Sequence, residues 1–192
     1  MSYPYVVRGS ELESFNTYNR EGPPVGTKMT IEDGRIYRFA QAGATALIVG
    51  NLHQALLWDK AKWGDQAVGT TAVGATKITG VGATTTNYAV NKLKYGYFFI
   101  DSAAYTGPAM RIKDNIVITQ GAATGTITLF NKTRLALAAA STCSYAGSVW
   151  RDPIICPSPA TGQLAGVSVK IIAAASFGWL QTGGACRCLC DA

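Results

Sequence analysis

The sequence predicts a mainly-β fold, a single-domain β-sandwich or β-barrel with an extended N-terminal arm. Short runs rich in Val, Ile, Thr and aromatic residues follow one another along most of the chain, a composition that is typical of strands. Gly, Pro and Asn separate these runs and favour turns. Long helical segments do not alternate with the strands, so a doubly wound sheet is not expected. With 192 residues, the chain can bury a sizeable core as one domain.

Residues 1–28 are polar and contain Pro4, Pro23 and Pro24, which favour an extended arm over a packed element. We expect this arm to lie along a neighbouring subunit. The mainly-β domain is then expected over residues 29–192.

The elements of this domain can be placed in order along the chain. A strand is expected near 34–40, and a second apolar run follows at 46–49. Residues 52–63 fit a short helix or an irregular loop. The Thr/Gly/Ala-rich stretch 66–90 is interpreted as a hairpin pair. Later strands are expected at 95–101, 109–113, 116–119, 126–130, 148–156, 167–172, 177–181 and 186–190, with one helical turn at 135–140.

The stretch from Gly166 to Gly184 has the densest apolar alternation in the chain. β-Branched residues come first, a turn of small residues follows, and a second short aromatic strand ends at two glycines. It contains no acid, thiol or imidazole, so it is suited to packing. The side chains expected to be mostly buried here are Val167, Val169, Ile171 and Trp179.

This stretch also resembles a known group of proteins. Gly166-Val167, the small-residue turn and the segment Phe177-Gly-Trp-Leu-Gln-Thr-Gly-Gly184 are similar to capsid decoration, or cement, proteins encoded near the major capsid protein of tailed bacteriophages. The segment Gly34–Ala40 with Gly43-Ala44, and the segment Ile127–Phe130, are similar to that group as well. The resemblance covers about two thirds of the chain and leaves out the arm and residues 64–90.

The resemblance implies a structural virion protein that binds the outer surface of a phage head and stabilises capsomer contacts. Such a protein is made in the host cytoplasm and is located on the capsid exterior. Its implied partners are the major capsid protein and other copies of itself. The alternative is a phage tail or adhesin-type binding module that recognises a host surface glycan.

The charge pattern is the next constraint on partners. Charged residues make up 15% of the chain, below the roughly 25% of an average domain, which is common where surface is hidden in an assembly. The alternative is a surface of Thr, Ser, Gly and Asn, in which the chain is also rich. The net charge of +6 would permit a nucleic-acid partner, but basic residues come in scattered pairs such as Lys92/Lys94 and Arg111/Lys113. Such pairs are expected on the solvent faces of separate strands, so no nucleic-acid partner is predicted. The sequence starts without the pattern of a signal peptide and has no apolar span of membrane length, so no membrane partner is predicted either.

The sequence indicates no catalytic set, no cofactor and no metal site. His53 is the only histidine, and neither a Gly-x-Ser-x-Gly elbow nor a pair of acids accompanies it. A small hydrolase that uses His53 is the enzymatic alternative. The run Cys186-Arg-Cys-Leu-Cys190 has strand-like alternation instead of the Cys-x2-Cys spacing that lets two sulfurs converge on zinc. Core packing is the preferred interpretation of these thiols, with a metal or a disulfide as the alternative.

Six residues are candidates for a protein interface, because Tyr, Trp and Arg anchor many interfaces. Two tyrosines lie in the polar arm, which cannot bury them locally. Two arginines of the arm could pair with carboxylates of a neighbour. A Trp-Arg pair fits either an interface or the core. The candidates are Tyr3, Tyr5, Arg8, Arg20, Trp150 and Arg151.

Overall fold

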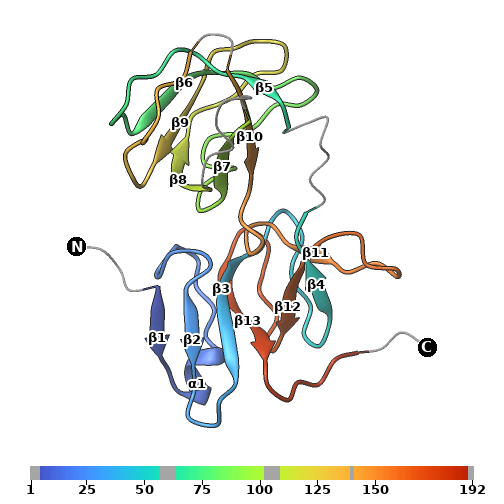
Figure 1. Cartoon of the computed structure of the whole chain (residues 1–192). Helices are drawn as coiled ribbons and strands as arrows, with labels where there is room; N and C mark the ends of the chain where they lie inside the picture. The colour runs from blue at the N-terminus through green and yellow to red at the C-terminus, as the bar shows by residue number, and fades with distance from the viewer. Residues whose placement is uncertain (1–4, 57–63, 102–108, 139–140, 190–192) are drawn as a thin grey trace. The chain divides into compact units, whose positions relative to one another are not determined.

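The structure, a computed structural model, describes residues 5–56, 64–101, 109–138 and 141–189. These residues form thirteen strands in two sheets and one four-residue helix, α1 (Glu11–Ser14). The predicted mainly-β fold is therefore confirmed (Figure 1). In the described ranges, no helix has the length and apolar character needed to cross a membrane.

The chain divides into two compact units, where the sequence analysis expected one domain over 29–192. Unit 1 consists of residues 1–57 and 149–192, and unit 2 of residues 58–148. Unit 2 is thus inserted between the two halves of unit 1. The strands of both units are short and are separated by the same turn residues, so strand and turn patterns do not mark the boundary.

Unit 1 is built on a seven-stranded sheet with the order β1-β2-β3-β13-β12-β4-β11. At its centre, the predicted strands near 34–40 and 177–181 pair antiparallel along nearly their whole length. The strands of this sheet are β1 (Val6–Arg8), β2 (Lys28–Thr30), β3 (Ile36–Gln41), β4 (Leu52–Gln54), β11 (Ile154–Ile155), β12 (Leu164–Ser168) and β13 (Phe177–Gly183).

The N-terminal residues belong to unit 1 and do not form the expected separate arm. β1 pairs in parallel with β2, and the backbones of Tyr18 and Phe177 exchange two hydrogen bonds of 2.8 and 2.7 Å. Ser14 and Val25 are buried. The expectation of an unpacked arm over 1–28 is wrong for residues 5–28, because β3 and β13 supply partners that lie far away in the sequence.

An aromatic cluster fills the interior of unit 1. The ring of Phe39 lies 5.0 Å from that of Trp179 and 5.9 Å from that of Phe177, measured between centroids. Trp179 and Val167 are buried as predicted. Both residues come from the β12–β13 pair, so the stretch from Gly166 to Gly184 does supply core.

Ile171 departs from the prediction, because 53% of its surface is exposed, and Val169 is only half-buried. β12 ends at Ser168, whose hydroxyl donates a 2.6 Å hydrogen bond to the carbonyl of Lys170. The chain bends at this bond and the alternation shifts by one residue. Ile172 therefore takes the inward place, where it is 1% exposed.

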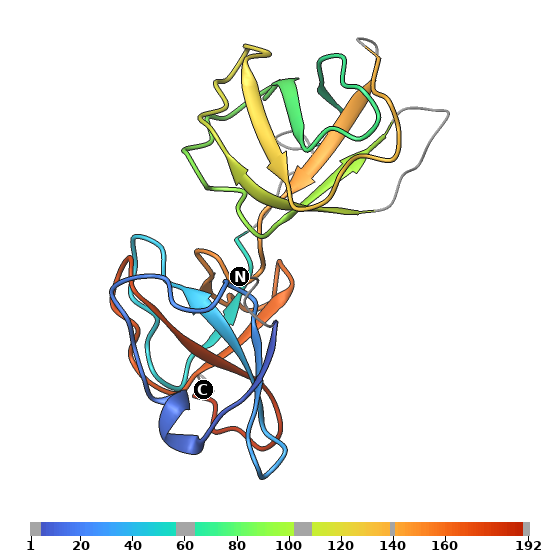
Figure 2. The same cartoon turned by 90° about the vertical axis from the view of Figure 1, so that its left-hand side faces the viewer.

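Unit 2 is a curled six-stranded sheet with the order β5-β10-β7-β8-β9-β6 (Figure 2). Its edge strands meet, because the amides of Gly69 and Gly82 donate 2.9 Å hydrogen bonds to the carbonyls of Thr79 and Ala67. These bonds join the two halves of the stretch expected to form a hairpin pair. The strands are β5 (Gln66–Ala67), β6 (Lys77–Val81), β7 (Tyr97–Ile100), β8 (Met110–Asn115), β9 (Gly125–Leu129) and β10 (Thr142–Ala146).

Other expected elements are shorter or absent in the described residues. The strand expected at 148–156 is reduced to the two residues of β11, and 186–189 form no strand. The helical turn expected at 135–140 is not helical over 135–138. β10 was not predicted, although its Tyr145 is fully buried in the interior of unit 2.

Replacing Trp179 by Ala should lower the free energy of unfolding by about 3–5 kcal/mol, because it removes a large ring that is 3% exposed. Ile171→Ala is the matched control from the same stretch, and its exposed side chain should cost within about 0.5 kcal/mol. Denaturant unfolding monitors both variants. An unchanged stability of the Trp179 variant would contradict its place in the core.

The closure of unit 2 can be tested at two glycines with positive φ, Gly80 (φ 66°) and Gly74 (φ 84°). An alanine at either position carries a backbone cost of about 1–2 kcal/mol. A Cβ at Gly80 would also lie 2.9 Å from backbone atoms of Gly69, whereas nothing lies within 4 Å of one at Gly74. Gly80→Ala should therefore lower the melting temperature clearly more than Gly74→Ala does. Equal decreases in melting temperature for the two variants would show that the close approach of Gly80 to Gly69 is unimportant for stability.

Candidate functional site

His53 lies in β4 and is fully buried. Burial lowers the pKa of its imidazole below the usual value of 6.5, while the backbone of Ile48 and of Ile154 acts in the opposite direction. Neither ring nitrogen makes a hydrogen bond of normal geometry to any described residue. Within the described ranges the structure therefore places His53 as a core residue, without a hydrogen-bonded acid or nucleophile.

The next residue, Gln54, has a role that the sequence analysis missed. Its buried side-chain oxygen accepts hydrogen bonds from the amides of Thr161 (3.0 Å) and Gly162 (3.1 Å). Its amide nitrogen donates to the Thr161 hydroxyl at 2.8 Å. A fixed side chain in β4 thus holds the exposed loop that connects β11 to β12. A lone Gln beside a His gives no sequence signal for this role.

Cys186 and Cys188 are exposed, so the expectation that they pack in the core is wrong; Cys190 lies outside the described residues. Gly184, with φ 82°, follows the end of β13, and the chain leaves the sheet there. The segment stays attached because the Leu189 amide donates to the Gly50 carbonyl at 2.7 Å. In the part of the chain that is described, no group of three or more His, Cys, Asp or Glu side chains could hold a metal ion.

A surface cavity of about 480 Å³ lies beside this C-terminal segment. Val49 and Leu189 supply apolar lining, and Arg35 and Arg187 supply positive charge. Arg35 is already engaged, because its guanidinium pairs with Glu11 at 2.7 Å and with Asp33 at 2.6 Å. The positive charge that Arg35 brings to the cavity is therefore already paired with two carboxylates of unit 1.

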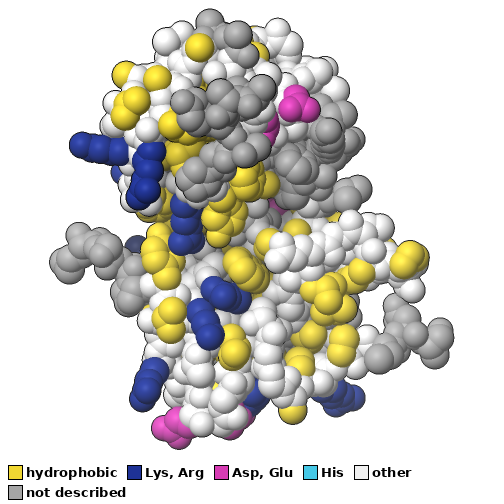
Figure 3. Space-filling model, viewed as in Figure 1, with side chains coloured by type: hydrophobic (Ala, Val, Ile, Leu, Met, Phe, Trp, Pro, Cys, Tyr) yellow, Lys and Arg dark blue, Asp and Glu magenta, His cyan; other side chains and the backbone are white. Residues whose placement is uncertain are grey.

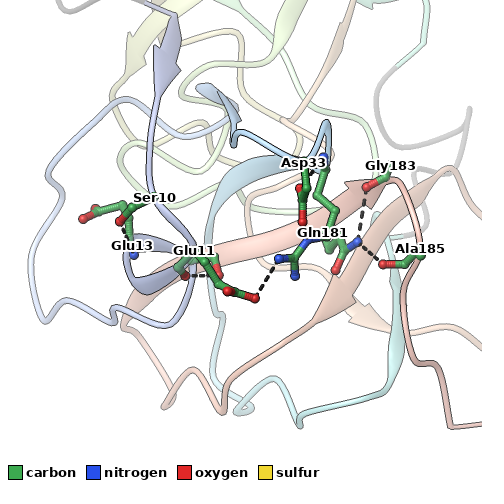
Figure 4. A network of polar contacts seen from close by, with 9 residues as sticks. Ser10, Glu11, Glu13, Asp33, Gln181, Gly183 and Ala185 are labelled. Carbon is green, nitrogen blue, oxygen red and sulfur yellow. Dashed lines mark hydrogen bonds and ion pairs between the residues drawn. The ribbon is translucent and has the colours of Figure 1, made fainter.

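Arg35 joins α1 to the turn between β2 and β3, and Figure 4 shows Glu11 and Asp33, the two acids of this polar network. The backbone N–H and the guanidinium of Arg35 hold the pKa of Asp33 below its usual range. Nearby, the side-chain amide of Gln181 donates to the carbonyls of Gly183 (3.2 Å) and Ala185 (2.7 Å). These contacts attach the first helix and the C-terminal segment to the sheet of unit 1.

The candidate interface residues do not gather into one cluster. Tyr3 lies outside the described residues. Tyr5 is 37% exposed next to edge strand β1, and Arg8 at the end of β1 and Arg20 are exposed as well. Trp150 is half-buried. Its indole N–H donates a hydrogen bond to the Ala165 carbonyl at 3.0 Å, and the Arg38 guanidinium lies 4.8 Å from the centroid of its ring. Arg151 is half-buried too, and its backbone forms an isolated parallel β-bridge with that of Gln41.

Large hydrophobic side chains of unit 1 are exposed around three parts of its fold. Figure 3 shows hydrophobic side chains at the surface of this unit. The first, which we name the apolar edge, consists of Ile154, Ile155 and Leu164, with 38%, 50% and 52% of their surfaces exposed. Ile154 and Leu164 flank Gln54 on opposite sides of β4. The second place is around β1 and α1, and the third is near the C-terminal segment. Their members are Val6, Leu12 and Phe15, and Ile48, Val49, Ile171 and Leu189.

Comparisons of the chain with protein-family models, with curated proteins and with solved structures give no match.

The burial of His53 predicts a pH-dependent stability. Above about pH 6.5 the imidazole is neutral in the folded and the unfolded chain. Below that pH the unfolded chain takes up a proton first, because the pKa is lowered in the folded state, so the folded state loses stability.

From about pH 7.5 to about pH 5, the melting temperature of the parent should therefore fall relative to that of His53→Leu. Thermal unfolding monitored by circular dichroism at each pH gives the two curves. Parallel curves for the two proteins would contradict a buried neutral imidazole.

Proposed function

We propose that the chain is a structural virion protein that binds the outer surface of a phage head and reinforces the contacts between capsomers. The major capsid protein and other copies of the chain are its partners. The observation that carries this proposal is the exposure of large aliphatic side chains on unit 1.

These side chains have the properties of an assembly surface. Val6 is 63% exposed and Leu12 79% exposed, in a chain whose charged residues make up only 15%. Covering apolar surface contributes about 25 cal/mol per Å², so a partner that covers several such residues gains substantial binding free energy. Several separate apolar places suit a lattice of identical sites, where modest contacts are multiplied by avidity.

The segments that resemble decoration proteins also support the proposal. Gly34–Ala40 contributes to β3, and the stretch from Gly166 to Gly184 contributes β12 and β13. β3 and β13 are neighbours in the sheet, and β12 pairs with β13. Two of the three similar segments are therefore neighbours in the sheet of unit 1, and the third, Ile127–Phe130, overlaps β9 of unit 2.

The described tryptophans give little support to the glycan-binding alternative. Sugar sites commonly present an open aromatic face. Trp179 is buried, and the ring of Trp150 is covered by the Arg38 guanidinium. Trp58 and Trp63 lie outside the described residues. We therefore propose a non-enzymatic protein of the capsid exterior, made in the host cytoplasm and without a cofactor.

The test is binding to heads of the encoding phage that were assembled without this protein. We expect the purified chain to co-sediment with such heads to a saturating, fixed ratio. Replacing Ile154, Ile155 and Leu164 together by Ser should weaken binding by about tenfold or more, because it removes the apolar edge. The control variant carries Ser at Val73 and Val90, which are exposed on unit 2 (63% and 57%), and it should bind as the parent does.

Melting temperatures ensure that the variants are folded. A parent chain that does not co-sediment with heads would contradict the proposed function. If the parent binds heads and the apolar-edge variant and the control lose the same amount of head binding, only the role of the apolar edge is contradicted.

A further inference from the structure

The outer face of unit 2 brings together aromatic and basic side chains from separate parts of the sequence. In β7, Phe98 and Ile100 are buried in the core, whereas Tyr97 is 47% exposed and Phe99 is half-buried. Tyr97 pairs directly with Arg111 of β8, and the rings of Tyr97 and Phe99 lie 6.4 Å apart. The alternation of both strands therefore places Arg111 beside two outward-facing rings.

A second pair of rings holds the guanidinium of Arg111. Its central carbon lies 5.8 Å from the ring centroids of both Tyr95 and Phe130. These two rings stack on each other at 6.1 Å, and the ammonium of Lys94 lies 4.8 Å above Tyr95. The packing restricts the cations before any partner arrives, which lowers the entropy that binding would cost.

We name this surface the cation–aromatic face. It includes exposed Lys113, which follows Arg111 by two residues and lies at the irregular step in the β8–β9 pairing. Figure 3 shows Lys and Arg side chains next to hydrophobic ones on this unit. The members of the face are Lys94, Tyr95, Tyr97, Phe99, Arg111, Lys113 and Phe130.

The charge of the chain is concentrated in the unit that carries this face. Residues 58–148 contain nine of the 17 lysines and arginines but four of the 11 acids, which gives unit 2 a charge of +5 out of the total of +6. Of these acids, Asp101 accepts a short hydrogen bond from the Ser144 hydroxyl, and Asp114 is half-buried opposite Thr128. The surface is thus complementary to an acidic partner.

We propose that the cation–aromatic face docks on a carboxylate-rich protein surface, which under the proposed function belongs to the major capsid protein. Carboxylates of the partner pair with Arg111, Lys113 and Lys94, and an apolar group covers the exposed ring of Tyr97. Arg and Tyr in one patch are the composition of interface hot spots.

The covered ring of Tyr95 favours a protein over a nucleic acid. Single-stranded nucleic acids bind by stacking bases on open aromatic faces. Tyr95 is buried, and its ring is already covered by Phe130, Arg111 and Lys94. This part of the face therefore presents positively charged groups in fixed positions, the guanidinium of Arg111 and the ammonium of Lys94. A carboxylate accepts hydrogen bonds from such donors.

The first test compares charge reversals in the head-binding experiment. Lys113→Glu changes an exposed residue, and Arg111→Gln/Lys113→Glu removes the positive charge of Arg111 and reverses that of Lys113. The control, Lys170→Glu/Arg187→Glu, reverses two exposed cations of unit 1. We expect binding to heads to weaken about tenfold or more for the face variants and to stay near the parent value for the control. Raising salt from about 50 to about 300 mM should weaken the parent more than it weakens the face variants.

The second measurement identifies the partner group. A carbodiimide couples an amine to a carboxylate without a spacer, so it joins only groups in contact. We expect mass spectrometry of coupled, decorated heads to find Lys113 or Lys94 joined to an Asp or Glu of the capsid protein. Coupling confined to lysines outside the face would overturn the proposal.

Two other outcomes separate the alternatives. Head binding that is equal for the parent and all variants would overturn this proposal and leave the proposed function standing, whereas a parent that does not bind heads would overturn both. A fluorescent oligomer of about twenty thymidines serves as the nucleic-acid probe. Tight binding of that oligomer, lost in Lys113→Glu, would assign the face to nucleic acid instead of protein.

Discussion

The pairing of β3 with β13 is the constraint on which unit 1 depends. It joins residues 36–41 to residues 177–183, which lie more than 130 positions apart in the sequence. Phe39 and Trp179 face each other across this pairing, and their ring contact fills the interior beside it. On one side β3 carries β2 and β1, and on the other β13 carries β12, β4 and β11. Without the central pair, the sheet would fall into two pieces that each lack a covered face.

The same pairing explains why the N-terminal residues are ordered in unit 1. Tyr18 binds the backbone of Phe177 at the start of β13, and its ring lies 5.8 Å from that of Phe39. Glu11 of α1 reaches Arg35 just before β3. The polar, proline-containing N-terminal segment has no hydrophobic face of its own to bury. Contacts with distant residues hold it in place instead. A free arm that contacts a neighbouring subunit is therefore not available in residues 5–28.

The mainly-β fold class was predictable from the sequence because the strand propensity of residues and the effect of turn residues are local. The partners of each strand were not, since pairing depends on residues elsewhere in the chain. β10 illustrates the limit: only Cys143 and Tyr145 point inward, between the small residues Thr142, Ser144 and Ala146, so the hydrophobic contrast is low. At Ile171 a single side-chain hydrogen bond of Ser168 shifts the alternation by one residue, and propensity scales do not include such bonds.

The candidate surfaces were predictable only in part for the same reason. The sequence analysis singled out aromatic and basic residue types as candidates for an interface, but their grouping is set by the fold. Arg111 meets Tyr95 and Phe130 because three separate stretches converge on one side of unit 2. His53 and the thiols of Cys186 and Cys188 show the opposite case, in which reactive residue types are placed by packing and chain direction.

The insertion of unit 2 into unit 1 has a consequence for synthesis on the ribosome. Unit 2 is continuous in sequence, so all its strands are available once residues 58–148 have emerged. Unit 1 cannot close until β13 follows, and until then the free edge of β3 is open to pairing with other chains. The order of translation therefore lets the inserted unit fold first, while the enclosing unit waits for the last strand to be made.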